Sequence, residues 1–137
     1  SHCHAWNAYI ARIMTEYLAG IRLLAPGFRK IGVMPYLAED LPFAEGSIAA
    51  PGGEIYVRWE RVPRGYTLKC CIPEGSSAEV VFPLFGRDAA VMERGQAVAA
   101  GGGFAKLPAE MQGLAIRAEE CRVQICSGFY FFTVELS

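Results

Sequence analysis

The sequence predicts a mainly β fold, an antiparallel β-sandwich preceded by one N-terminal α-helix. Two observations predict it. Apolar residues recur at three- and four-residue spacing up to Leu18, and after Pro26 they alternate at a period of two between regularly spaced turn signals. At 137 residues the chain is long enough for one domain that buries about two-thirds of its unfolded surface. We therefore expect one domain with a helical appendage.

The helix is expected over residues 5–19, where two stripes of side chains run along it. The large apolar stripe consists of Trp6, Ile10, Ile13, Met14, Tyr17 and Leu18. The second stripe consists of the small residues Ala8, Ala11, Thr15 and Ala19. Small residues let another helix approach closely, so we expect packing on two sides, as in the last piece of a larger helical body; a lone helix on a sheet is the alternative. Gly20 supplies the left-handed stop.

The strands follow in order, each bounded by turn signals. The first five are expected over residues 30–37, 43–48, 54–60, 66–72 and 78–82. Weak strands near residues 89–92 and 96–99 come next, within a Gly-rich stretch, and the last three are expected over residues 114–118, 122–126 and 129–136. Short strands at this spacing favour a sandwich or a related antiparallel barrel.

Alternation within the strands predicts which side chains face the core. In the strand over residues 54–60 these are Ile55, Val57 and Trp59. In the next strand they are Tyr66, Leu68, Cys70 and Ile72, which leaves Cys71 on the opposite face. In the last strand Tyr130 and Phe132 share one face and Phe129 and Phe131 the other. One aromatic pair is therefore expected in the core, and the other is either buried against the missing helical body or exposed as a sugar-binding platform.

Charge and composition exclude several kinds of partner. The formal net charge is −1, which gives no field to attract nucleic acid or an anionic membrane. No apolar run approaches the roughly 18 residues of a membrane span, and the start of the chain lacks the layout of a signal peptide. We therefore expect a soluble segment, cytoplasmic or periplasmic, with no nucleic-acid and no membrane partner. Because the first residue is Ser1 rather than Met, we interpret the chain as a fragment; a processed or trimmed product is the alternative.

No metal and no cofactor is expected. His2, Cys3 and His4 are three potential metal ligands in a row, but only the two histidines share a face of an extended chain, and the sequence holds no other histidine. The glycine triplet at 101–103 lacks the Lys-Ser/Thr pair of a phosphate-binding loop, so we interpret it as a hairpin tip.

No catalytic residue is expected in this chain. Glycoside hydrolysis needs two carboxylates that face each other across a sugar, and no pair among the 14 acidic residues is placed by its spacing to do so. No Ser/His/Asp or Cys/His pattern is present either. The residues best suited to a sugar are His4, which can donate and accept hydrogen bonds, and Trp6, whose indole offers an apolar face. A capping histidine and a core tryptophan are the alternative roles.

Several stretches resemble the C-terminal end of bacterial α-L-rhamnosidases. They are SHCHAWNA (1–8), AGIRLLAPGF (19–28), PYL (35–37), GSI (46–48), GEIYVRW (53–59) and SGFYFF (127–132). The resemblance covers residues 1–83 well, weakens over residues 84–120 and returns at the last of these stretches. The family commonly has glycine where Ala5 stands and serine where Asn7 stands, so the sequence departs from the family pattern at these two positions, and the resemblance implies no contact from Asn7.

The resemblance implies that residues 1–25 carry the last helix of an (α/α)6 catalytic barrel and that residues 26–137 form a C-terminal β-sandwich. Such enzymes remove terminal α-L-rhamnose with inversion, using a general-acid glutamate and a base carboxylate that are both expected upstream of this chain. In the family the histidine that matches His4 lies at the sugar pocket, so the resemblance implies a substrate contact there and at Trp6. The implied partners are a rhamnoside, reached through the parent barrel, and the missing catalytic domain itself.

Three functions follow as hypotheses. The first is a structural, non-catalytic C-terminal domain of an α-L-rhamnosidase. The second is an independent carbohydrate-binding sandwich, which a planar row of exposed aromatic residues would favour. The third is a self-contained glycosidase, which would require hydrolysis of rhamnosides by this chain alone.

Overall fold

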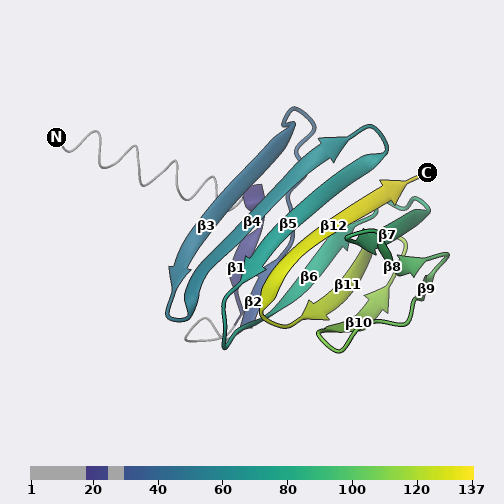
Figure 1. Ribbon diagram of the computed structural model, residues 1–137. Coiled ribbons are helices and arrows are strands. Elements are labelled where there is room, and N and C mark those ends of the chain that lie inside the picture. Colours follow the sequence, from purple (N-terminus) through teal and green to yellow (C-terminus); the bar gives the residue numbers. More distant parts are fainter. Residues whose placement is uncertain (1–17, 25–29) are drawn as a thin grey trace.

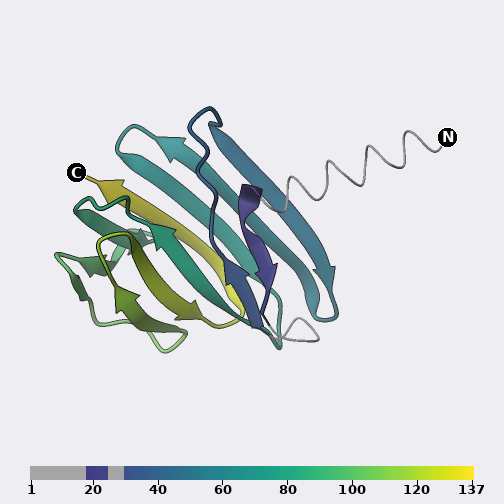
Figure 2. The same cartoon turned by 180° about the vertical axis from the view of Figure 1, so that it is seen from behind.

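The computed structural model describes residues 18–24 and 30–137, which form two β-sheets packed face to face (Figure 1). One sheet contains, in spatial order, β1 (Ile21–Leu23), β2 (Lys30–Val33), β6 (Ser77–Pro83), β11 (Glu120–Ile125) and β10 (Met111–Ile116). The other contains β3 (Phe43–Ala50), β4 (Gly53–Val62), β5 (Gly65–Ile72), β12 (Gly128–Leu136), β7 (Ala89–Glu93), β8 (Gln96–Ala100) and β9 (Gly103–Phe104). Figure 2 shows the five-stranded sheet in front of the seven-stranded one.

The predicted β-sandwich is confirmed, with one parallel pair in it. Every other strand pair is antiparallel, whereas β2 and β6 run in parallel. The chain forms β3, β4 and β5 in the opposite sheet before it returns to form β6. Parallel neighbours need a long connection of this kind, because a tight hairpin can join only antiparallel strands.

The core lies between the sheets and contains the side chains that alternation predicts. From β4 these are Ile55, Val57 and Trp59, and from β5 they are Tyr66, Leu68, Cys70 and Ile72. Phe82 of the five-stranded sheet meets Phe132 of the seven-stranded sheet edge to face, with ring centroids 4.9 Å apart. Aromatic pairs in this geometry contribute about 0.5–1.5 kcal/mol beyond their burial, so this contact helps to fix the two sheets together.

Some strand predictions are wrong in their bounds. No strand is expected at β1, because three residues are too few to show alternation; it forms by pairing along β2, with Ile21 opposite Val33. The expected strand over 30–37 ends at Val33, since the following Pro35 has no amide hydrogen for a ladder. The expected strand over 114–118 lies instead at Met111–Ile116, where a bulge after Gly113 shifts the register.

The Gly-rich stretch forms hairpins. β7 and β8 coincide with the two weak strands and are joined by Arg94 and Gly95, both with positive φ (49° and 82°). Gly101 and Gly102, at φ 60° and 79°, join β8 to β9 in the same way. Two-residue turns with positive φ at both positions match the twist of paired strands, which confirms the glycine triplet as a hairpin tip.

The expected helix over residues 5–19 falls outside the described residues except at its end. Leu18 and Ala19 have helical backbone, and Gly20 follows with φ 89°. The proposed boundary between residues 1–25 and 26–137 also lies largely outside them. Within residues 18–24 and 30–137, no helix has the length and apolar character that crossing a bilayer requires.

Candidate functional site

The chain enters the sandwich through a hydrogen-bonded junction at Leu18. Its carbonyl oxygen accepts a hydrogen bond of 2.8 Å from Nε1 of Trp59 and one of 3.2 Å from the amide of Tyr36. The Trp59 side chain is fully buried in β4. A buried indole N–H needs a partner, and here the partner is the backbone of the incoming segment. The junction therefore fixes residue 18 against the core of the seven-stranded sheet.

Gly20 completes the junction at a position where the backbone conformation and a neighbouring carbonyl group leave no room for a side chain. Its φ is 89°, and a Cβ built on it would lie 1.9 Å from the carbonyl oxygen of Met34. That close approach allows the Gly20 carbonyl to accept a 2.9 Å hydrogen bond from the amide of Met34. The left-handed stop expected at the end of the helix thus also places β1 beside β2.

The predicted sugar contacts, His4 and Trp6, lie outside the described residues, as do His2 and Cys3. Within residues 18–24 and 30–137, no group of three or more His, Cys, Asp or Glu side chains is placed to hold a metal ion.

The aromatic residues of β12 divide between the two faces as alternation predicts. Tyr130 and Phe132 are buried, whereas Phe129 is 50% exposed on the outer face. Cations lie over the outward rings: Arg94 is 5.9 Å from the centroid of Phe129, and Lys69 is 5.4 Å from that of Phe131. Because cations occupy the ring faces on which a sugar would stack, this face does not provide the open aromatic row of a carbohydrate platform.

The outer face of the seven-stranded sheet continues as a mixed array of charge. Arg58 lies 4.2 Å from the ring centroid of Phe43 and forms ion pairs with Glu45 (3.3 Å) and Glu60 (3.4 Å). The hydroxyl of Tyr56 donates to Glu45 at 2.9 Å. Burial, followed by this hydrogen bond, raises the pKa of Tyr56. The two carboxylates are thus engaged by neighbours on the same face.

Carboxylates on the outer face of the other sheet are engaged in the same manner. Arg122 of β11 binds Glu79 of β6 at 2.8 Å and Glu120 at 2.6 Å. Hydrogen bonds to Glu120 and then to Glu79 raise the pKa of the guanidinium. An acid and a base for glycoside hydrolysis must face a sugar, and these carboxylates instead hold an arginine between them.

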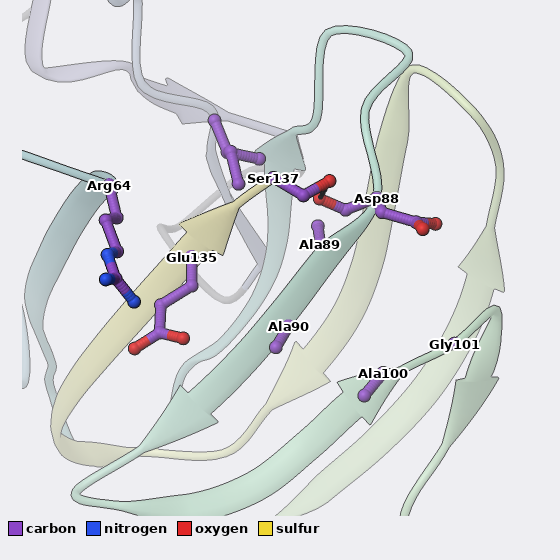
Figure 3. Close-up of a pocket in the computed structure, with 9 residues that line it drawn as sticks. Arg64, Asp88, Ala89, Ala90, Ala100, Gly101, Glu135 and Ser137 are labelled. Carbon is purple, nitrogen blue, oxygen red and sulfur yellow. Dashed lines mark hydrogen bonds between the residues drawn. The ribbon is translucent and has the colours of Figure 1, made fainter.

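A hollow of about 550 Å³ lies at the end of the seven-stranded sheet (Figure 3). Ala90 and Ala100 form its floor, and Arg64, Asp88 and Glu135 stand around it. Figure 3 shows the carboxylates of Asp88 and Glu135 pointing away from each other, so they do not make a catalytic pair. The sequence gives no signal for this hollow, because its residues come from segments that only the pairing of β12 with β5 and β7 brings together.

Comparison with known proteins places the fold in a family. Residues 20–97, more than half of the chain, match the model of the bacterial α-L-rhamnosidase C-terminal domain. An α-L-rhamnosidase from Alteromonas sp. (strain LOR) is 39% identical over 74 residues, and one from Streptomyces avermitilis is 28% identical over 84 residues. These alignments cover 54% and 58% of the chain, but only 8% of either relative.

Solved structures share the fold. An α-L-rhamnosidase from Dictyoglumus thermophilum superposes with a TM-score of 0.74 at 23% identity, over 86% of this chain and 12% of that one. The Streptomyces avermitilis α-L-rhamnosidase, crystallised with L-rhamnose, gives 0.62 at 22% identity, over 89% of this chain and 10% of that one. In both, the superposed part is a small portion of a much longer chain.

Proposed function

The chain belongs to the family of bacterial α-L-rhamnosidase C-terminal domains, and from that membership we propose that it is the C-terminal part of an α-L-rhamnosidase. In this proposal the hydrolysis of terminal α-L-rhamnose is carried out by a catalytic domain outside the sequence. The observation that carries the proposal is the match of residues 20–97 to the family, in a chain that spans 8% of its curated relatives. The sandwich itself is structural and supplies no catalytic group.

The junction at Leu18 supports a role in attachment. In the proposal, residues 1–25 carry the last helix of the catalytic barrel and residues 26–137 form the sandwich that packs on it. The hydrogen bond from buried Trp59 to the Leu18 carbonyl would then tie the sandwich directly to the end of that helix. His4 and Trp6 are proposed as substrate contacts in the barrel, with the rhamnoside as the substrate of the whole protein.

The engaged carboxylates support the non-catalytic part of the proposal. Arg58 and Arg122 each hold two of them on the outer sheet faces, and the carboxylates beside the hollow of Figure 3 diverge. A hydrolytic pair would require one carboxyl group held in an apolar pocket as the acid and a second one facing it.

Hydrolysis of 4-nitrophenyl α-L-rhamnopyranoside tests the proposal. We expect turnover by the protein translated from the complete coding sequence and none by the 137-residue chain. In the complete protein, replacing His4 by Ala should raise KM, because a ground-state contact is lost. Turnover by the 137-residue chain that is abolished by Glu135→Gln or Asp88→Asn would overturn the proposal and establish a self-contained glycosidase.

A further inference from the structure

A tight turn after β6 holds a large aromatic side chain in an unfavourable backbone conformation. Phe85 has φ 58° and Gly86 has φ 70°, and the amide of Arg87 donates to the carbonyl of Leu84 at 3.0 Å. This is a two-residue turn of the type that strongly prefers Asn, Asp or Gly at its first central position. A bulky residue with positive φ is an outlier, and such outliers concentrate at functional sites.

The neighbouring loop holds this turn in place. The amide of Leu84 donates to the carbonyl of Glu119 at 2.8 Å, and the amide of Gly86 donates to that of Ala118 at 2.9 Å. Phe85 itself contributes little to the core, because its side chain is 51% exposed. Unlike Phe129 and Phe131, it has no cation over its ring among the described residues. The backbone thus presents an open aromatic face to the surroundings.

Phe85 and Leu136, the last residue of β12, line a cavity of about 520 Å³. Figure 1 shows the end of the sandwich where β12 finishes. Arg61, Arg64 and Arg87 line the same cavity, and Glu39 is the only acidic side chain among the described residues that line it. The lining therefore carries an excess of positive charge in a protein whose formal net charge is −1. A concave site with a few convergent polar groups and an apolar wall is typical of small-molecule binding.

Two of the three arginines are held in place by main-chain oxygen atoms. Arg61 donates through Nε to Leu41 (3.0 Å) and through Nη2 to Leu37 (2.7 Å) and Ala38 (2.8 Å). Nε of Arg87 donates at 2.6 Å to the main-chain oxygen of Ser137, which belongs to a carboxylate because Ser137 is the last residue of the 137-residue chain. Both Nη groups of Arg87 remain without a protein acceptor in the described part of the chain. Immobilised guanidinium groups lose little further freedom on binding, which favours recognition of a ligand.

The third arginine, Arg64, has no side-chain partner among the described residues. Arg64 makes no side-chain hydrogen bond or ion pair with the described residues, although Glu135 stands near it in the adjoining hollow (Figure 3). Guanidinium groups bind carboxylates through two parallel hydrogen bonds, and these bonds are among the stronger ones that proteins form. Arg64 and the Nη groups of Arg87 are thus available to bind an anion in the cavity that Phe85 lines.

We propose that this cavity binds an acidic sugar residue, a uronate, with its carboxylate on Arg64 and Arg87 and its pyranose ring against Phe85. The charge excess accounts for the carboxylate, and the open aromatic face accounts for the ring. The cavity is separate from the junction at Leu18. Failure of this binding proposal would therefore leave the proposed attachment role unaffected, and the reverse also holds.

Side-chain NMR of the 137-residue chain tests the proposal with three probes: D-galacturonate, its neutral counterpart D-galactose, and acetate, which has the charge without the ring. We expect D-galacturonate to shift the Nε–H signals of Arg64 and Arg87 saturably, with affinity at least about fivefold above that of either other probe. If acetate bound as tightly as D-galacturonate, the cavity would be a general anion site. If D-galactose bound as tightly as D-galacturonate, the cavity would not recognise the charge. The absence of any saturable shift would exclude the site altogether. Each of these three outcomes overturns the proposal.

Variants separate binding from folding. Phe85→Asn should raise the melting temperature, because asparagine tolerates positive φ, and should weaken D-galacturonate binding at least about threefold. Arg64→Gln should leave the melting temperature unchanged and weaken binding at least about fivefold. Arg22→Gln, which removes the same charge from β1, is the matched control and should bind normally. If either cavity variant binds as tightly as the unsubstituted chain, the proposal is wrong.

Discussion

At the scale of single residues, Gly20 has the strictest requirement in the junction. Two separate constraints act on it: a left-handed backbone, and a carbonyl oxygen 1.9 Å from where a Cβ would lie. Gly75 has almost the same φ, 85° against 89°, with nothing within 4 Å of its would-be Cβ. An alanine at position 75 would thus experience backbone strain alone, whereas an alanine at position 20 would experience strain and a steric clash.

We expect Gly20→Ala to lower the free energy of unfolding by more than about 2 kcal/mol, because strain and collision add. Gly75→Ala should cost only about 1 kcal/mol, the strain alone. Urea unfolding of the two variants and the unsubstituted chain measures the difference. Equal losses would mean that the Met34 carbonyl moves aside without cost.

Single-residue predictions from the sequence succeed where alternation determines them. Ile55, Val57 and Trp59 share the buried face of β4, as a period of two requires. Alternation gives no information about hydrogen bonds, so the bond from Trp59 to the Leu18 carbonyl could not be predicted; it joins residues 41 positions apart. The charge over Phe129 and Phe131 depends in the same way on which strands become neighbours.

At the scale of elements, β9 and β10 close the sandwich between its two sheets. The ring of Phe104 in β9 packs so closely on Gly113 of β10 that a Cβ at position 113 would lie 2.6 Å from the ring. β9 belongs to the seven-stranded sheet and β10 to the five-stranded one. This contact therefore spans the two layers beside the bulge of β10.

Gly113→Ala should lower the free energy of unfolding by about 1–3 kcal/mol, the usual cost of overpacking. Phe104→Leu should relieve the overlap, so the double variant is expected to lose less than the sum of the two single variants. Thermal unfolding of the four proteins forms the complete cycle. Additive losses would show that the ring and the glycine do not constrain each other.

Long strands with clear alternation were predictable, and short or edge elements were not. β3 to β6 fall within a few residues of their expected positions, because each carries several alternating apolar residues between turn signals. β1 and β9 have three and two residues, too few to show a period. Their existence depends on neighbouring strands that lie elsewhere in the sequence.

At the scale of the whole molecule, buried thiols give the fold a dependence on alkaline pH. Burial raises the pKa of Cys121 from 9.0 to about 11, and burial raises that of Cys70 further still. Both thiols stay protonated in the folded chain over a range where the unfolded chain loses its protons. Stability should therefore be complete below about pH 9 and fall as the pH rises through about 11.

Urea midpoints measured under reducing conditions at about pH 7, 9 and 10.5 check this expectation. Cys121→Ala should be less stable at neutral pH, because a small cavity forms, but its midpoint should decrease less between the two alkaline values. A midpoint that stays constant up to about pH 10.5 would contradict the burial of these thiols.

The candidate sites depend on the whole molecule, which is why the sequence did not reveal them. Arg61 comes from β4, Arg64 from the turn between β4 and β5, and Phe85 and Arg87 from the connection between β6 and β7. Because β6 and β7 belong to different sheets, only the packing of one sheet on the other gathers these residues around one cavity. The family, in contrast, was recognisable from local stretches, because a stretch such as GEIYVRW is contiguous in the chain.

The junction at Leu18 also has a mechanical consequence. Within six residues the chain is hydrogen-bonded to Trp59 of the seven-stranded sheet at Leu18 and then forms β1 at the edge of the five-stranded sheet. A pulling force applied through residues 1–17 would therefore act on both sheets at the same time, instead of detaching the edge strand β1 from its own sheet alone. The resistance to such a force would then depend on the hydrogen bonds that Leu18 accepts from Trp59 and Tyr36 and on the pairing of β1 with β2.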